Sequence, residues 1–426
     1  METVFAGLVL VATLVLVLIR PKDVNEAWWA VLGGVLSLLL GLVSLSQAES
    51  ILLNTQDALV LLVGMMALSA VAEKAGFFEW AASLTAKAGG GSVIRLYGFV
   101  FLVGTLITAT LSLDATAIVL TPILYGMVVR LRLSPLPFMF ACVYMANTAS
   151  LFLPISNLTN LLAYDTFDLG FVRFALLMLI PATLAVLANA LVLAWLFRED
   201  LRGSYDKKLS PFVAEDRAFF GMATGGVGGV VVAFFLAPIV GIPIGLVALM
   251  VGAIVVIVAR LRGWMSLREV AGAISWGILV LVVGLFVVVQ GVENVGLAQA
   301  VREAFAVEAP GDGFFQILGI TMGTTLGSNF INNVPMIVLA LGASKPLVSN
   351  GTLGHSAVYA VILGTNIGPN LTTVGSLATL IWLSITRGKG MDITAKDYLK
   401  IGVISTPVIL LAAVVGLRIS LWLLGS

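Results

Sequence analysis

Residues 59–64 read Leu-Val-Leu-Leu-Val-Gly and residues 279–284 read Leu-Val-Leu-Val-Val-Gly, so one short pattern occurs twice, 220 positions apart. Nine residues after its final glycine, each copy carries a glutamate, which is Glu73 in the first and Glu293 in the second. A single match of this kind arises readily by chance among Leu- and Val-rich helices. A duplication would show further matches in the same order.

Two further matches follow. Asp114-Ala-Thr-Ala-Ile-Val-Leu parallels Asn333-Val-Pro-Met-Ile-Val-Leu at a separation of 219 residues, and Asn157-Leu-Thr recurs as Asn370-Leu-Thr. Ordered matches at nearly constant separation are typical of transporters built from two structural repeats. The sequence therefore predicts a duplicated fold.

The composition predicts that the chain lies in a membrane. Of 426 residues, 60% are hydrophobic and 11% are charged, and apolar runs of about twenty residues match the length that a helix needs to cross a bilayer. The first run, 4–19, is preceded by Glu2 and by no basic residue, so it reads as a retained span rather than a signal peptide. The expected fold class is an all-α polytopic membrane protein, with the lipid bilayer as its surroundings.

The same sequence excludes several kinds of function. The single cysteine, Cys142, permits neither an internal disulfide nor a thiolate metal site. No G-x-x-x-x-G-K-[ST] loop is present, so we expect no nucleotide hydrolysis by this chain. The net charge of +1 and the lack of a basic, aromatic-interleaved patch give no sign of nucleic-acid binding. We expect a transporter rather than an enzyme, without a cofactor or a bound metal.

Two segments decide the topology, because each is longer than one span and too short for two. They are about 94–131, whose only charge between Arg95 and Arg130 is Asp114, and about 312–344. If both cross the membrane, the 23 Lys and Arg divide 12 to 11 between its faces; if both are re-entrant hairpins, they divide 19 to 4. The positive-inside rule selects the hairpins. The loop between the halves is then cytoplasmic, and both termini lie outside a bacterial inner membrane.

Five spans per half is an odd number, so the second repeat is predicted to be inverted relative to the first. The predicted repeats are 1–197 and 219–426, joined by a cytoplasmic loop at 198–218. Short interfacial helices are expected at Glu79–Lys87 and Ala298–Phe305. The expected spans are 4–20, 27–46, 57–75, 136–165, 171–197, 219–238, 244–260, 275–292, 355–386 and 400–423.

Polar clusters containing Pro or Gly interrupt the spans 136–165 and 355–386. The backbone groups that such residues free are tolerated at membrane depth only where protein or a water-filled cavity satisfies them, so we expect two broken helices that line a site. The two hairpin tips carry similar polar residues, and tips and breaks related by inversion would meet near the middle of the membrane. The candidate binding residues are Ser112, Asp114, Thr116, Asn147, Ser156, Asn157, Thr159, Asn329, Asn332, Asn333, Asn366, Gly368, Asn370 and Thr372.

Asp114 differs from the other candidates because it is the only charged residue well inside an apolar segment. Burying a charge there costs at least about 2.5–3.5 kcal/mol, so an intramembrane carboxylate indicates a function. Its counterpart Asn333 cannot ionise, which makes Asp114 the predicted proton-coupling residue. Glu73 and Glu293 stand at span ends, where a solvated helix terminus is the expected role. Taken singly, a buried Asn, Ser or Thr is explained as well by a hydrogen bond between two helices as by a binding role.

With these clusters identified, the chain resembles the arsenite efflux permease family, within the ion-transporter superfamily that includes dicarboxylate carriers and some sodium/proton antiporters. The likeness covers nearly the whole chain. It rests on four motifs, Leu-Asp-Ala-Thr-Ala-Ile-Val-Leu-Thr-Pro at 113–122, Leu-Pro-Ile-Ser-Asn-Leu-Thr-Asn-Leu at 153–161, Ser-Asn-Phe-Ile-Asn-Asn-Val-Pro-Met at 328–336 and Gly-Thr-Asn-Ile-Gly-Pro-Asn-Leu-Thr at 364–372.

The resemblance implies export of arsenite and antimonite as neutral trihydroxides in exchange for protons, and hence arsenic resistance. It also implies an elevator-like motion of the hairpin-bearing part and, in some cases, assistance from a cytoplasmic ATPase partner. The family is often drawn with twelve spans, whereas the charges of this chain favour ten spans and two hairpins.

The residues agree with this substrate only in part. A trihydroxide is small, uncharged and rich in hydrogen-bonding groups, which suits Asn, Ser and Thr side chains. No Lys or Arg lies near the clusters, which argues against a dicarboxylate, although helix N-termini and a bound sodium ion could hold an anion. Two alternatives stay open. One is a sodium/proton antiporter in which Asp114 and amide oxygens bind the cation, and the other is a different ion-coupled anion carrier of the superfamily.

Overall fold

The computed structural model describes residues 2–19, 25–206, 212–296, 313–349 and 353–425. Within these ranges the regular structure is helical, which confirms the predicted all-α fold. Eight of the described helices are long and apolar enough to cross a membrane, so the chain is a multi-pass membrane protein. The interfacial helix expected at Ala298–Phe305 lies outside the described residues.

The first half begins with α1 (Glu2–Ile19), α2 (Glu26–Leu39), α3 (Leu45–Lys74), α4 (Phe77–Ala88) and α5 (Val93–Thr110). A helical run follows, made of α6 (Leu113–Ala115), the π-helical turn η2 (Thr116–Leu120) and α7 (Thr121–Arg130). The half ends with α8 (Leu136–Ala149), the 3-10 turn η3 (Pro154–Ser156), α9 (Leu158–Phe167) and α10 (Phe171–Leu196). α3 starts well before the span predicted from residue 57, because Ser44 and Gln47 form a capping box that begins the helix there.

The second half begins with α11 (Arg217–Val240), α12 (Ile244–Leu261), α13 (Leu267–Ala273) and α14 (Trp276–Asn294). It continues with α16 (Phe314–Ile331), α17 (Asn333–Ser349), α18 (Ser356–Ile367), the 3-10 turn η4 (Gly368–Asn370), α19 (Leu377–Gly388) and α20 (Ala395–Leu424). α13 and α14 together occupy the place of α3 in the order of elements. Where α3 is continuous, Ile274 has an extended backbone that separates α13 from α14.

Helices of each half pack against helices of the other half. α12 of the second half lies along α3, and α2 of the first half lies along α14. Gly64 of α3 touches the backbone of Ala248 in α12, where a Cβ atom would come within 2.4 Å of the carbonyl carbon. Gly284 of α14 meets Ala30 of α2 in the same way, at 2.7 Å. These glycines end the two copies of the repeated pattern. The pattern therefore recurs because both copies need a residue without a side chain where helices touch.

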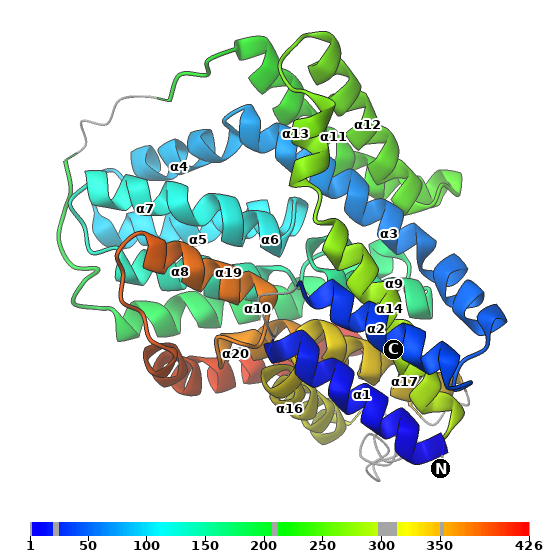
Figure 1. Cartoon of the computed structure of the whole chain (residues 1–426). Helices are drawn as coiled ribbons and strands as arrows, with labels where there is room; N and C mark the ends of the chain where they lie inside the picture. The colour runs from blue at the N-terminus through cyan, green and yellow to red at the C-terminus, as the bar shows by residue number, and fades with distance from the viewer. Residues whose placement is uncertain (1, 20–24, 207–211, 297–312, 350–352, 426) are drawn as a thin grey trace.

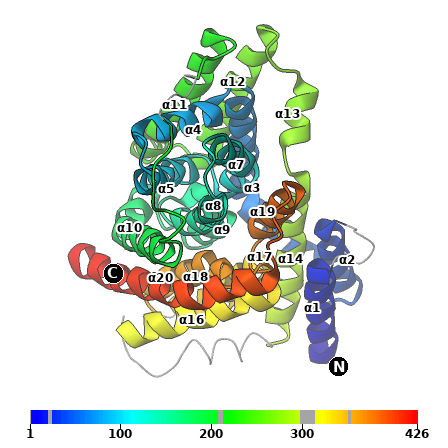
Figure 2. The same cartoon turned by 90° about the vertical axis from the view of Figure 1, so that its left-hand side faces the viewer.

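Figure 1 shows α1 and α2 on one side of the molecule and α11 and α12 on another, with the long helix α3 reaching from the α11–α12 pair towards α2. In Figure 2, α20 and α16 run side by side along one edge, and α20 also packs along most of α10. Between these outer helices lie α8 and α18, whose residues 137–149 and 356–367 are all buried. A helix that is buried on every side can present polar groups only to protein or to an internal cavity.

Each segment predicted as a hairpin consists of two helices joined at a tight turn. α5 meets the run 113–130 at Leu111–Ser112, and α16 meets α17 at Asn332. Thr108 and Thr116 join the arms of the first hairpin through their hydroxyls at 2.8 Å. An arm of 18 residues is about 27 Å long, close to the hydrocarbon thickness of about 30 Å. Length alone therefore does not separate a re-entrant hairpin from two crossings, and the re-entrant arrangement stays a prediction.

We predict that Gly64→Leu separates α3 from α12 and lowers stability by about 1–3 kcal/mol, because the added side chain has no room at the Ala248 backbone. The measurement is the melting temperature of the detergent-purified protein. Gly228→Ala in α11 is the matched control, since a Cβ there would meet nothing within 4 Å. Equal melting temperatures for Gly64→Leu and the wild type would contradict the close helix contact.

Candidate functional site

Four helices begin at one cavity of about 60 Å³. They are the run 113–130, α9, α17 and α19, and their first residues or N-caps line the cavity together with side chains from α1 and α14. The first N–H groups of a helix have no partner inside it, and a helix N-terminus carries a partial positive charge. The cavity therefore receives hydrogen-bond donors from four directions. The polar residues that line it are Asp114, Asn157, Asn332, Asn333 and Ser376.

Three of these helices start where they do because an N-cap side chain accepts a hydrogen bond from the first turn. Ser112 Oγ accepts from the Ala115 N–H at 3.1 Å, and Asn157 Oδ1 accepts from the Thr159 N–H at 3.2 Å. Ser376 Oγ accepts in the same way from the N–H of the third residue of α19 at 3.1 Å. Ser and Asn are preferred at such caps, so the local sequence places the helix starts at the cavity.

The fourth helix, α17, starts after a strained residue. Asn332 has φ 74° and ψ 156°, a conformation that is ordinarily open only to glycine. Two hydrogen bonds hold this tip to the turn segment that precedes α19. Asn332 Nδ2 donates to Val374 O at 3.1 Å, and the Asn333 N–H donates to Gly375 O at 2.9 Å. The second hairpin tip is thus tied to the second break, beside the cavity.

Asn366, in the buried helix α18, stabilises the break in the first half. Its side-chain oxygen accepts hydrogen bonds from Ser150 Oγ at 2.7 Å and from the amide of Asn157. Its amide nitrogen donates to Thr159 Oγ1 at 3.1 Å and to Asn160 Oδ1 at 2.8 Å. One side chain of the second half thus satisfies four polar groups at the break between α8 and α9.

Asn147, in the buried helix α8, makes the corresponding contacts in the second half. Its amide nitrogen donates to Asn370 Oδ1 at 2.9 Å and to Thr379 Oγ1 at 3.4 Å. Its oxygen accepts from Ser376 Oγ at 3.5 Å, and Asn370 in turn donates to Thr148 Oγ1 at 3.1 Å. Each broken helix is therefore stabilised by an asparagine from the other half.

Each hairpin is also bonded to the break of its own half. Ser156 in η3 donates its hydroxyl proton to Ala109 O in α5 at 2.8 Å. Asn329 in α16 donates to Gly368 O in η4 at 2.9 Å and accepts from Thr372 Oγ1 at 2.7 Å. These bonds connect hairpin and broken helix within a half into one unit.

The structure thus divides the predicted site residues into two groups. Asp114, Asn157, Asn332 and Asn333 line the cavity, and Ser112 lines a second cavity that adjoins it. Within the described part of the chain, the side chains of Asp114 and Asn333 make no hydrogen bond or ion pair, so both are available to a ligand. The predicted residues that are bonded to other protein groups and do not line these cavities are Thr116, Asn147, Ser156, Thr159, Asn329, Asn366, Gly368, Asn370 and Thr372.

Ser376 lines the cavity and was not among the predicted residues. It caps α19 as Asn157 caps α9, and the two lie 219 positions apart, which is also the separation of Asp114 and Asn333. The Asn-Leu-Thr match had instead paired Asn157 with Asn370, which lies six residues earlier. The constant separation, applied to Asn157, would have found Ser376.

The adjoining cavity of about 210 Å³ shares Asp114, Asn157 and Leu158 with the first. It continues along α3 as far as Glu73, at the end of that helix. One cavity therefore reaches from Asp114 to the C-terminal end of α3.

Paired helix breaks and hairpin tips that meet at one cavity in a multi-pass membrane protein are typical of secondary transporters. The chain belongs to the arsenical pump membrane protein family, whose pattern matches residues 5–423. An arsenical pump membrane protein of Escherichia coli is 31% identical over 425 residues, and that of Escherichia coli strain K12 is 33% identical over 425 residues. Each alignment covers 98% of this chain and 98% of the relative.

A solved structure shares the fold. The crystal structure of the Alcanivorax borkumensis YdaH transporter, described as having an unusual topology, is 17% identical and covers 90% of each chain with a TM-score of 0.60. At that identity the likeness concerns the fold alone.

We predict that Asn366→Ala lowers the melting temperature of the purified protein by several degrees. It removes the donor to Thr159 Oγ1 and Asn160 Oδ1 in a buried region, at about 1–3 kcal/mol for each unsatisfied group. Ser150 keeps its hydrogen bond to Asn147 O. Asn333→Ala is the control, because its side chain bonds to no other group in the described structure. Melting temperatures that fall equally in both variants would show that the Asn366 contacts do not hold the break.

Proposed function

We propose that this protein is a secondary transporter that exports arsenite and antimonite as neutral trihydroxides in exchange for protons. The observation that carries the proposal is the convergence of four helix N-termini and one unbonded carboxylate, Asp114, on a single cavity. Membership of the arsenical pump membrane protein family supports the class of substrate.

The cavity offers what a trihydroxide needs on every side. Helix N–H groups and the Asn333 amide donate to its oxygens, while the Asp114 carboxylate accepts from its hydroxyls. Among the described residues that line the cavity, none is basic. An anion would therefore meet the negative charge of Asp114 without a compensating side chain, so the site favours a neutral solute.

Asp114 couples the export of substrate to the entry of protons if a proton and the substrate bind to it alternately. Its charged form accepts hydrogen bonds from the substrate hydroxyls, whereas its neutral form has lost most of that capacity. Substrate then binds from the cytoplasm to the carboxylate, and a proton bound from outside displaces it. Because Asn333 cannot ionise, one side chain carries the exchange even though the fold is duplicated.

Contacts between loops support the predicted topology. The Tyr205 N–H donates to Gly91 O at 2.9 Å, and the Val93 N–H donates to Gly203 O, so the start of the first hairpin lies against the loop between the halves. If each hairpin segment crossed the membrane once, as a single long span, these two loops would lie on opposite faces. We therefore propose two inverted repeats with re-entrant hairpins, the interhalf loop in the cytoplasm and both termini outside an inner membrane. A cytoplasmic ATPase partner of the kind that the resemblance implies would bind on the face of that loop.

Proton-driven uptake of arsenite into everted membrane vesicles tests the function. We expect the wild type to accumulate arsenite and Asp114→Asn to lose that accumulation, because the amide keeps the size of the side chain but cannot exchange a proton. Asp200→Asn, an exposed carboxylate after α10, is the matched control and should behave as the wild type.

Two results would contradict the proposal. Accumulation of arsenite by Asp114→Asn against its gradient would show that the coupling proton binds elsewhere. Proton movement on addition of sodium alone, without arsenite, would instead identify the sodium/proton antiporter.

The topology has a separate test in a Cys142→Ser background, with single cysteines labelled by an impermeant maleimide. Ser204→Cys should react in intact cells only after permeabilisation, because its loop is cytoplasmic. Gly425→Cys should react without permeabilisation. Protection of Gly425→Cys in intact cells would overturn the ten-span arrangement.

A further inference from the structure

Two further cavities are each lined by a glutamate, and the two glutamates occupy equivalent positions of the repeated sequence pattern. Glu73 lines the cavity of about 210 Å³ that also contains Asp114. Glu293 lines a cavity of about 340 Å³ between α3, α9, α14 and α17, which does not include Asp114. The two glutamates stand 220 positions apart in the duplicated pattern. Neither position was expected to do more than end a helix in water.

One face of α3 joins Glu73 to the binding cavity. Met66, Ser69 and Glu73 follow one another at helical spacing along the cavity wall, so Ser69 lies about one turn, or roughly 5–6 Å, from Glu73. Ser112, two residues before Asp114 in the chain, also lines this cavity. The space between the two carboxylates is therefore bordered by hydroxyls, and its volume exceeds what a single water molecule needs.

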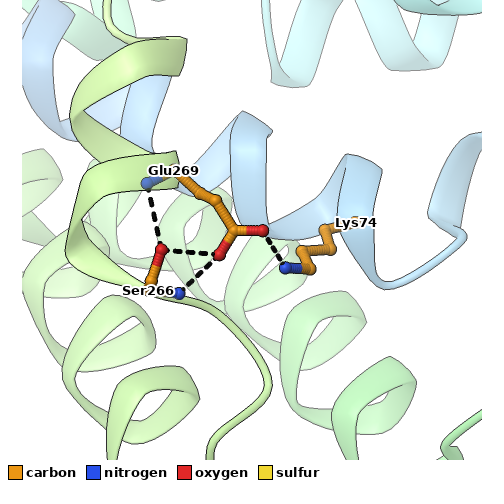
Figure 3. Close-up of polar contacts among 3 residues, drawn as sticks. All are labelled: Lys74, Ser266 and Glu269. Atoms are coloured by element: carbon orange, nitrogen blue, oxygen red, sulfur yellow. Dashed lines mark hydrogen bonds and ion pairs between the residues drawn. The ribbon is translucent and has the colours of Figure 1, made fainter.

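The charged groups near Glu73 leave its carboxylate without an ion pair in the described structure. Its neighbour Lys74 is paired instead with Glu269 of α13, whose carboxylate also accepts hydrogen bonds from the N–H and the hydroxyl of Ser266 at 2.7 Å (Figure 3). The Lys74 ammonium, followed by the Ser266 bonds, lowers the pKa of Glu269 to about 2. The Glu269 carboxylate thus stays ionised at physiological pH. Glu79 of α4 adds only a like charge.

We propose that Glu73 is the proton-transfer group that releases the coupling proton to the cytoplasm, which rests on the proposed proton exchange. The proton leaves the Asp114 carboxyl, crosses water in the shared cavity and is accepted by the Glu73 carboxylate, which then gives it to bulk water. Asp114 is left charged, Glu73 returns to its charged form, and no electrons are transferred. The role differs from substrate binding, because Glu73 does not line the binding cavity.

Glu293 is the counterpart of Glu73 in the second half, and in the proposed topology it lies towards the outer face of the membrane. Its Oε1 lies so close to Gly342 of α17 that a Cβ there would come within 2.3 Å of it, and Asp165 and Lys345 share its cavity. Asp114 is not among the residues that line that cavity in this conformation. Glu293 therefore serves proton uptake only after the outward change of conformation.

The test compares two measurements in everted vesicles. The first is net uptake of arsenite driven by a proton gradient. The second is arsenite–arsenite exchange, measured in vesicles that are preloaded with arsenite and have no proton gradient. Exchange moves substrate both ways and needs no proton release. We expect Glu73→Gln to lower net uptake into everted vesicles about tenfold, in the range of a lost proton-transfer group, and to change exchange less than about twofold. Higher buffer concentration at the cytoplasmic face should restore part of the net rate, since small buffers replace a missing proton acceptor.

Two variants complete the design. Glu73→Asp keeps a carboxylate and should retain most of the net rate. Glu49→Gln, an exposed glutamate on the same helix that lines none of these cavities, should equal the wild type.

The outcomes are distinct. An equal loss of net uptake and exchange in Glu73→Gln, or a net rate unaffected by the substitution, would overturn the proton-transfer role while leaving arsenite transport established by the wild type. Absence of both uptake and exchange in the wild type would overturn this role and the proposed function together.

Discussion

The structure depends on one constraint, which is that backbone and amide groups exposed by a broken helix must find partners where no bulk water reaches them. Asn366 meets this need at the first break and Asn147 at the second, each from a buried helix of the other half. Each half also contributes to its own break, because Asn160 donates to Ser150 O and Leu153 O and Asn329 donates to Gly368 O. The contacts of Asn366 and Asn147 add bonds that join the two halves at both breaks.

Satisfying the breaks from the side leaves the helix starts free to face the cavity. Four N-termini converge there, and the caps on Ser112, Asn157 and Ser376 use up only part of their donor capacity. Donors alone would form a site for an anion. Asp114 changes that character, because a carboxylate among the donors balances their partial positive charge and provides acceptors. On the proposed function, the chemistry of the site would follow from one difference between the two matching motifs, which is Asp114 in the first and Asn333 in the second.

Much of this could be predicted from the sequence. Apolar runs gave the membrane fold, Pro and Gly within polar clusters marked the breaks, and the lone intramembrane charge identified Asp114. The sequence could not predict which asparagine side chains bond to protein groups and which face the cavity, because Asn366 and Asn333 are the same residue type in similar motifs. Only the arrangement in space shows that the first is saturated by protein groups and the second is free. The early start of α3 was also not predicted. Residues 45–56 have a polar composition, but the capping box before them begins the helix there.

The two halves share an order of elements but differ in shape. This difference decides on which side of the molecule the cavity at Asp114 extends. α3 is continuous, and its residues Ile51 and Thr55 line the cavity that does not reach Asp114. The corresponding stretch of the second half is interrupted between α13 and α14, and Ala273 and Ser275 at this interruption line the cavity that does reach it. An interrupted helix leaves space beside the first hairpin tip that a straight helix would fill. On the proposed function, this asymmetry would open the cavity at Asp114 towards one face only, and transport would then require the hairpin units to shift against α3 and α14.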